Sequence, residues 1–308
     1  MILSVCPNPS IDCTIEVKDL NVGRLNRVEN KSVTYAGKAF NAAIGVARLG
    51  EDSFLTGFMY DDNGKMFVHK LDDENVQNTF IWNKGGARTN YKIVDRRSMM
   101  TEINDKGEEV SSGKQKELIS LVKQLSEKTA VSIMSGSLPL GVDDEFYYKL
   151  CNAVSSEVKK IVDTTGNRLL AALKAGVYLV KPNIYELTEI TGEEYTDFKS
   201  MIKGCEKIIG LGAENVLLSL GKDGAIITDG IKSYYCKSAN VAVNSTVGAG
   251  DSMVAAAAVM ISFGESPNEI LRSAVAAGTA SVTTPGTNLF YRDKFEEIYA
   301  KLTVEEIL

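Results

Sequence analysis

Short apolar runs alternate along the chain with longer segments in which apolar residues recur every three or four positions. The apolar runs have the length of buried strands, and they occupy residues 2–6, 53–59, 130–136, 159–165, 177–183 and 215–220. The helical spacing occupies residues 41–50, 114–128, 144–154, 167–176 and 199–212. Because strands and helices alternate, the sequence predicts an α/β fold with a mostly parallel sheet that helices flank on both faces.

Two stretches depart from this alternation. Residues 11–35 and about 88–103 alternate polar with apolar positions and lack helical spacing, which is typical of half-exposed antiparallel strands. We expect them to form a small β-sheet that projects over the site as a lid or serves as a dimer surface. Residues 225–230 and 232–236 indicate a late hairpin. The chain has no internal repeat or linker, so we expect a single domain over residues 1–308.

Composition narrows the function classes. With a net charge of −6, a pI near 5.1 and no basic run, the chain is not expected to bind nucleic acid. No apolar run approaches the ~20 residues of a membrane span. Five widely spaced cysteines without a CxxC pair indicate reduced thiols and a cytoplasmic protein. His69 is the only histidine, on a predicted surface helix, so any general base is expected to be a carboxylate.

The stretch NSTVGAGDSMVAAAAVMISFG, residues 244–264, places a carboxylate directly after a glycine-rich turn and before an apolar helix. We expect a strand end at 240–245 and a helix at 252–263. Gly248 and Gly250 permit a tight turn whose backbone N–H groups, with the helix dipole, suit a transferring phosphoryl group. Asp251, at or near the N-cap, would then accept a proton from a substrate hydroxyl. The alternative is a routine N-cap aspartate.

Five segments, in this order, resemble the signatures of one enzyme family. They are NPSID (8–12), AGKAFNAAIGVARLG (36–50), KPNIYE (181–186), SLGKDG (219–224) and TVGAGD (246–251). By these segments the chain is identified as a member of the PfkB, or ribokinase-like, carbohydrate kinases. Within that family, NPSID and STVGAGDSMVA are most similar to the bacterial 1-phosphofructokinase branch, with the tagatose-6-phosphate kinases near by. Neither a P-loop sequence nor a GxGxxG fingerprint after a strand is present.

The resemblance implies a single ribokinase-like domain whose β lid pairs into a homodimer. It implies transfer from ATP, with Mg²⁺, to a hydroxyl of a sugar phosphate, with fructose 1-phosphate giving fructose 1,6-bisphosphate. Asp251 would be the base, and the amides of Val247, Gly248, Ala249 and Gly250 would form the anion hole. Two alternatives stay open. One is a kinase for tagatose 6-phosphate or for another sugar or nucleoside, and the other is a catalytically weak sugar- or nucleotide-binding regulatory protein.

The resemblance also implies which residues bind the two substrates. Asp12 would bind sugar hydroxyls, and the rest of the acceptor set would be Arg27, Gly37, Lys38, Asn41, Arg88 and Ser137. Glu186 would act on Mg²⁺ through water, and the ATP set would be Lys181, Asn183, Ser219, Gly221, Gly224, Thr246, Val275, Gly278 and Thr279. Each set has a structural alternative: the two arginines as solvated surface cations, Asn183 with Glu186 as a capping box, and residues 275–279 as helix packing.

The chain departs from the family pattern on the acceptor side only. The glycine-rich sugar loop has Ala36 and Ala39 at positions where the family has glycine, and a methyl group there disfavours positive φ. Tyr60 and Asp61 stand where the family has a glycine pair. We therefore expect the sugar pocket to differ in shape while the catalytic turn and the ATP segments are intact.

Overall fold

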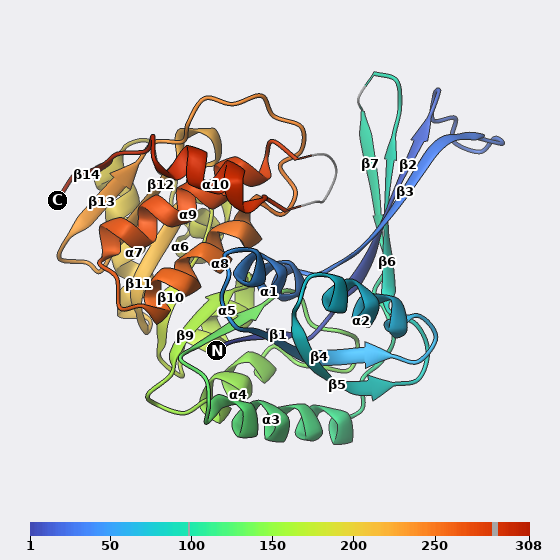
Figure 1. Ribbon diagram of the computed structural model, residues 1–308, viewed down its shortest axis with the longest axis horizontal. Helices are drawn as coiled ribbons and strands as arrows, with labels where there is room; N and C mark the ends of the chain where they lie inside the picture. The colour runs from blue at the N-terminus through green and yellow to red at the C-terminus, as the bar shows by residue number, and fades with distance from the viewer. Residues whose placement is uncertain (98, 285–288) are drawn as a thin grey trace.

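A ten-stranded sheet forms the centre of the protein in this computed structural model, which describes residues 1–97, 99–284 and 289–308 (Figure 1). Seven adjacent strands are parallel, because each is connected to the next by a helix or a long crossover. In spatial order they are β5 (Gln77–Asn83), β4 (Ser53–Tyr60), β1 (Ile2–Cys6), β8 (Val131–Ser135), β9 (Lys159–Asp163), β10 (Val177–Val180) and β11 (Ala213–Ser219).

Three antiparallel strands extend this sheet at its β11 edge. They are β12 (Ala225–Thr228), β13 (Ser233–Cys236) and β14 (Val304–Glu306). The predicted late hairpin is therefore confirmed. The predicted α/β class is also confirmed, since the sheet is mostly parallel and is covered on both faces.

The helices form two layers, one on each face of the sheet. On the first face the buried side chains come from α1 (Lys38–Arg48), α2 (Gly64–Asp73), α8 (Ala249–Ser262), α9 (Pro267–Ser281) and α10 (Arg292–Tyr299). On the second face they come from α3 (Ser112–Ser126), α4 (Phe146–Ala153), α5 (Gly166–Leu173), α6 (Ile184–Thr191) and α7 (Phe198–Gly210). No helix within the described residues is long and apolar enough to cross a membrane.

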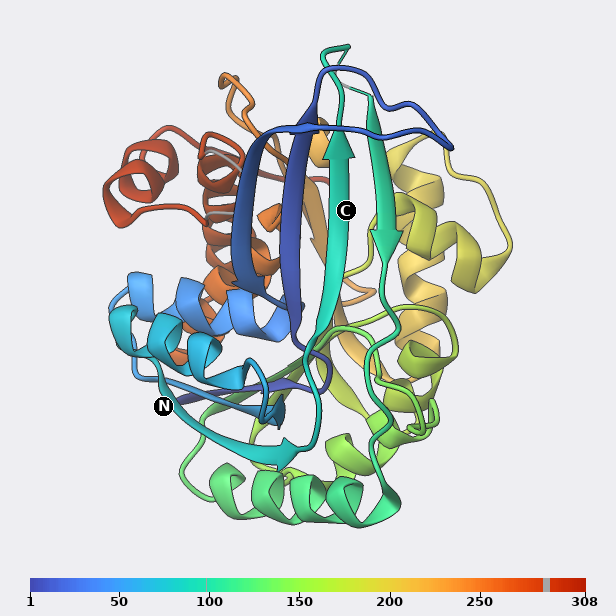
Figure 2. The ribbon, with the colours of Figure 1, turned by 90° about the vertical axis from the view of Figure 1, so that its right-hand side faces the viewer.

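A four-stranded sheet stands apart from the main sheet (Figure 2). It consists of β3 (Val28–Ala36), β2 (Ser10–Val17), β6 (Arg88–Val94) and β7 (Met100–Asn104) in that order. The outer pairs are antiparallel as predicted, but β2 and β6 are parallel, because they come from separate segments that leave the main sheet in the same direction. The strand alternation gives this sheet one polar face, with Asp12 and Asn90, and one apolar face, with Val33 and Tyr91.

The segment before the glycine–aspartate turn differs from the prediction. Residues 240–245 form no strand, because the backbone N–H of Asn244 bonds to the carbonyl of Val282 at the end of α9 rather than to a neighbouring strand. Helix α8 begins at Ala249, three residues earlier than predicted. This earlier start places Asp251 inside the first helical turn.

Candidate active site

Four charged residues of the candidate site, three of them predicted, come from elements that end at one edge of the main sheet. Lys38 and Asp251 lie in the first turns of α1 and α8, and Asp163 and Lys181 lie at or just beyond the carboxyl ends of β9 and β10. Carboxyl ends of parallel strands and the helix N-termini above them meet at the same edge of an open sheet, where ligands bind. The fold therefore brings together side chains that are far apart in the sequence.

Asp251 faces this edge and is not an N-cap. The N-cap of α8 is Gly248, whose φ of 81° is in the left-handed region, and the helix has no side-chain cap. The buried Asp251 carboxylate instead accepts a hydrogen bond from Asn41 Nδ2, 2.7 Å from its Oδ2. The alternative of a routine N-cap aspartate is wrong, and Asp251 keeps a carboxylate oxygen available for proton transfer.

The environment of Asp251 makes its carboxylate more basic than usual. Burial raises the pKa of Asp251 to about 6, and the nearby charge of Asp163 adds to this rise. Lys38, Asn41 and Lys181 act in the opposite direction. At neutral pH the group is therefore ionised but close to its pKa, as a general base should be.

Asp163 lies at the centre of the site, and the sequence analysis missed it. Its carboxylate is 2% exposed, and its Oδ1 is 3.1 Å from Lys38 Nζ and 3.6 Å from Lys181 Nζ. Burial alone would raise the pKa of Asp163, but Lys181 and Lys38 outweigh it and hold the pKa below its usual value. A polar residue that directly follows a buried strand run, as in KKIVD, was the signal available in the sequence.

The glycines of the turn allow Lys181 to approach the start of α8. A Cβ at Gly250 would lie 3.2 Å from Lys181 Nζ, tighter than ordinary packing permits. The first N–H groups of a helix have no partner inside the helix, and Gly250, in the first turn of α8, lies next to this ammonium group. Two of the four predicted anion-hole amides are partly engaged, because Val247 donates to Ser245 Oγ and Ala249 makes a long bond to the Thr246 carbonyl.

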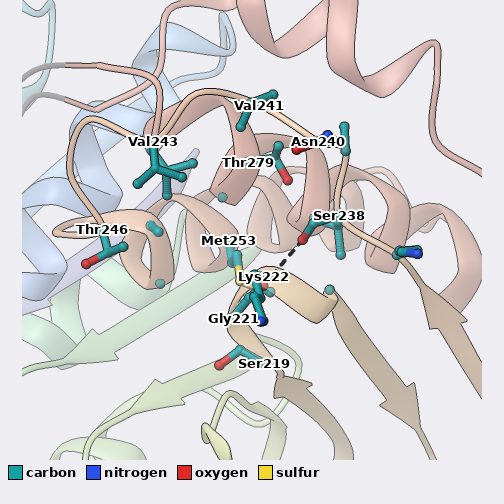
Figure 3. Close-up of a pocket in the computed structure, with 18 residues that line it drawn as sticks. Ser219, Gly221, Lys222, Ser238, Asn240, Val241, Val243, Thr246, Met253 and Thr279 are labelled. Carbon is teal, nitrogen blue, oxygen red and sulfur yellow. Dashed lines mark hydrogen bonds between the residues drawn. The ribbon is translucent and has the colours of Figure 1, made fainter.

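A pocket of about 600 Å³ opens beside the turn (Figure 3). Apolar side chains of the loop before α8, among them Val241 and Val243, lie on one side of it, and Ser219 and Gly221 lie on the other. All seven residues predicted for the nucleotide beyond KPNIYE line it, namely Ser219, Gly221, Gly224, Thr246, Val275, Gly278 and Thr279. The sequence analysis missed most of the loop that covers the pocket and two lysines in its lining: Lys222, Lys237, Ser238, Ala239, Asn240, Val241 and Val243.

Asn183 and Glu186 form the capping box that the sequence suggested. Glu186 Oε2 accepts the Asn183 N–H at 2.8 Å, and Asn183 Oδ1 accepts the Glu186 N–H at 2.9 Å. This arrangement fixes the start of α6 and holds the Glu186 carboxylate at the same edge of the sheet as Lys181.

Polar side chains of the small sheet and of the loops below it contact one another on the side predicted for the acceptor. Asp12 accepts from Asn90 Nδ2 at 3.0 Å and from Lys92 Nζ at 3.2 Å. Arg88 donates to Asn90 Oδ1, while its buried Nε has no partner within the described residues. Ser137 accepts from Asn8 Nδ2 at 3.1 Å. These contacts involve three segments predicted around the sugar phosphate, namely residues 8–12, the start of β6 and Ser137.

Arg27 lies apart from the other acceptor residues within one chain. It precedes β3 at the far tip of the small sheet and is exposed. The register pairs Asp12 with Thr34 but Val17 with Val28, so Val28 lies about 17 Å farther along the strands than Asp12, and Arg27 precedes it by one more residue. The structure does not bring Arg27 to the site of its own chain.

Comparisons with known proteins agree with this architecture. The family model described as pfkB family carbohydrate kinase matches residues 7–294. The chain belongs to the pfkB family of carbohydrate kinases. It is 31% identical to the 1-phosphofructokinase of Borreliella burgdorferi, over 100% of this chain and 99% of that protein. It is 30% identical to a tagatose-6-phosphate kinase of Staphylococcus epidermidis, over the full length of both.

Solved structures of the pfkB family place the same fold over nearly the whole chain. The structure of Escherichia coli phosphofructokinase-2 in complex with substrates and products matches with a TM-score of 0.88 and 29% identity. The match covers 97% of this chain and 98% of that chain. The predicted family and fold class are therefore confirmed.

The departures from the pfkB pattern have different structural consequences. Ala36 and Ala39 are buried, and neither needs a positive φ, because the tight turn of the sugar loop lies at Gly37 with φ of 147°. Tyr60 is buried at the end of β4, and its hydroxyl has no hydrogen-bond partner among the residues that the structure describes. Asp61 is exposed. The alanines therefore fit the backbone, and Tyr60 is the departure that changes the packing near the acceptor side.

Proposed function

We propose that this protein transfers the terminal phosphoryl group of ATP to a hydroxyl of a sugar phosphate, with fructose 1-phosphate as the favoured acceptor. The observation that carries the proposal is the position of Asp251 between two sites. On one side lies the pocket of about 600 Å³, and on the other lie Asn41 and Lys38 of the sugar loop. The identity of relatives named 1-phosphofructokinase supports the choice of acceptor.

The proposed reaction uses Asp251 as the general base. The substrate hydroxyl gives its proton to the Asp251 carboxylate as its oxygen bonds to the terminal phosphorus of ATP. The bond from that phosphorus to the bridging oxygen breaks, and ADP leaves with the electron pair. The N-terminus of α8 and the ammonium group of Lys181 would stabilise the charge on the moving phosphoryl oxygens.

The donor set at this edge suits Mg²⁺ that arrives with the nucleotide. No group of three or more His, Cys, Asp or Glu side chains that could hold a metal ion occurs in the described ranges. Mg²⁺ in kinases keeps several waters and binds through one or two carboxylates together with substrate phosphates. Glu186 would hold it through water, and the ion would neutralise phosphate charge during transfer.

An acceptor panel tests the proposed function. ADP production coupled to a dehydrogenase is measured with fructose 1-phosphate, fructose 6-phosphate, tagatose 6-phosphate, fructose and a nucleoside. We expect the highest kcat/KM with fructose 1-phosphate. A preference for tagatose 6-phosphate would make that compound the proposed acceptor in place of fructose 1-phosphate. No turnover with any compound would support the alternative of a catalytically weak binding protein.

Arg88→Ala should weaken the binding of phosphorylated acceptors. Its guanidinium donates to Asn90 at the start of β6, and loss of a charge-assisted contact to phosphate costs roughly 10- to 100-fold in acceptor KM. The KM for ATP should stay within about twofold. Arg96→Ala, which removes an exposed arginine paired with Glu29, is the control. An unchanged acceptor KM in Arg88→Ala would reject the phosphate contact.

The small sheet would form a homodimer through its apolar face and act as a lid. Val33, Tyr91 and Ile103 lie in one row across β3, β6 and β7, and they are 46%, 41% and 56% exposed. A row of exposed apolar side chains on a self-complementary sheet face fits a second copy of the chain.

All five cysteines are free and buried, which agrees with a cytoplasmic location.

Ile103→Asp should separate the proposed dimer, because a charge in the centre of a symmetric interface is buried twice. Sedimentation velocity should show a dimer for the native chain and a monomer for Ile103→Asp. Glu102→Gln changes the neighbouring position, which faces the other side of the sheet, and should leave the dimer intact. A monomeric native chain would reject the interface.

A further inference from the structure

One carboxylate oxygen serves two lysines that come from opposite sides of the site. Lys38 belongs to the sugar loop at the start of α1, and Lys181 belongs to the segment after β10 that faces the nucleotide side. Both ammonium groups point to Oδ1 of Asp163, at 3.1 Å and 3.6 Å. The three residues therefore form a chain of charges that runs from the acceptor side to the donor side.

The three charged side chains differ in how deeply they are buried. Asp163 and Lys181 have side chains that are 1% and 6% exposed, while Lys38 is 38% exposed and opens toward the acceptor side. Two ammonium groups held this close repel each other, and a buried carboxylate without a cation costs several kcal/mol. The lysines and Asp163 therefore stabilise one another, and removal of the carboxylate leaves two like charges, that of Lys181 buried, without a fixed position.

The buried Asp163 carboxylate neither caps a helix nor packs as an apolar core residue, so its position needs another reason. Its side chain also accepts weakly from Ser135 Oγ at 3.5 Å, so the lysines are its main partners. Phosphate groups of both substrates need cations at defined positions, because transfer requires the reacting atoms to be aligned. Asp163 is placed to define both positions at once.

We propose that Asp163 is a positioning residue that holds Lys38 and Lys181 in register for the phosphates of the acceptor and the donor. The proposal rests on the proposed function of the same site. In this role Asp163 acts through the two lysines rather than on the transferred group or the hydroxyl. Asp163 is also one of the groups that surround Asp251. The others are Lys38 and Asn41 of α1, Lys181 after β10 and Cys6 of β1.

Asp163→Asn separates positioning from binding. The lysines lose their fixed places, so kcat should fall about 100-fold or more. The KM values for ATP and for the acceptor should not rise, because the site gains net positive charge. The acid limb of kcat/KM should move to lower pH, because the variant removes a negative charge that raises the pKa of Asp251.

Glu74→Gln is the matched control. Glu74 also lies between two cations, with Arg48 Nε at 2.8 Å and Lys70 Nζ at 2.7 Å, but at the end of α2 and outside the site. The variant removes the same charge from a carboxylate that is also held by two cations, although its side chain is 13% exposed. Its kcat, KM values and pH profile should equal those of the native protein, even where its free energy of unfolding falls.

A second variant keeps the test decisive if Asp163→Asn folds poorly. The Lys38→Met variant lacks the ammonium group that Asp163 holds on the acceptor side. Adding Asp163→Asn to Lys38→Met should therefore lower kcat by less than about tenfold, whereas independent roles would give the full loss. Folding of each variant is checked by urea unfolding.

The outcomes distinguish the two proposals. If the native protein turns over no acceptor, the proposed function fails before any variant is compared. If the native protein is active and Asp163→Asn keeps its kcat and its acid limb, the positioning role is rejected. A rise in both KM values with an unchanged acid limb would also reject it, since that pattern indicates only a distorted pocket.

Discussion

Asp251→Asn should lower kcat by at least about 10³-fold while ATP binding changes by less than about threefold. The variant removes the proton acceptor and keeps the size of the side chain, so the pocket and the helix N-terminus stay intact. Turnover with the best acceptor and calorimetric binding of a non-hydrolysable ATP analogue measure the two effects. Full activity of Asp251→Asn would remove the base from the proposed mechanism.

The same substitution should stabilise the protein. Because the folded-state pKa of Asp251 is about 6 and its ordinary value is 3.8, ionisation of this group at pH 7 opposes folding. This group's contribution to stability therefore increases as pH falls through about 6. Asp251→Asn should raise the free energy of unfolding at pH 7 by about 1 to 3 kcal/mol in urea titrations.

Asp293→Asn is the control for both measurements. Asp293 lies in the first turn of α10, where it is exposed and outside the site. Turnover should not change in this variant, and the free energy of unfolding should not rise. A gain in stability with Asp293→Asn equal to that with Asp251→Asn would show that burial of Asp251 is not the cause.

Gly224→Ala should abolish nucleotide binding and destabilise the fold by about 3 kcal/mol or more. Gly224 has φ of 96°, and a Cβ there would lie 2.0 Å from the carbonyl oxygen of Cys236. The loop that lines the pocket would have to move away from β13. Calorimetric titration with the ATP analogue and urea unfolding measure the two losses.

Gly221→Ala separates backbone strain from collision. Gly221 lies in the same loop with φ of 60°, but a Cβ there meets no atom within 4 Å. This variant should lose only about 1 kcal/mol, the cost of a left-handed alanine. Equal losses in the two glycine variants would mean that contact with Cys236 does not determine the loop.

Local signals in the sequence were sufficient for six of the seven parallel strands, whereas the residues of the donor pocket followed from the resemblance to the pfkB family. The central strands are apolar on both faces, so their runs are hard to mistake, whereas the turn at Ser219 and the helix at Gly278 carry no local mark of a nucleotide. The segment 240–245 also contains a short apolar run, Val241-Ala242-Val243, yet its backbone bonds to the end of α9. Only the tertiary contact decides such a case.

Asp163 and Arg27 show why part of the site could not be predicted. Lys38 and Asp163 are 125 residues apart, and only the order of strands in the sheet makes them neighbours. The position of Arg27 depends on the length and register of the hairpin between β2 and β3, which the polar alternation did not specify. Contacts set by topology have no local signature in the sequence.

The central place of β1 affects how the protein reaches its fold. All five residues of β1 are buried, and Ile2 pairs with Ser53 on one side and with Val131 on the other. One backbone edge of this apolar segment therefore stays unpaired until β8, far along the chain, has joined it. Such distant pairings slow folding and leave an edge that other copies can capture, so renaturation is favoured at high dilution.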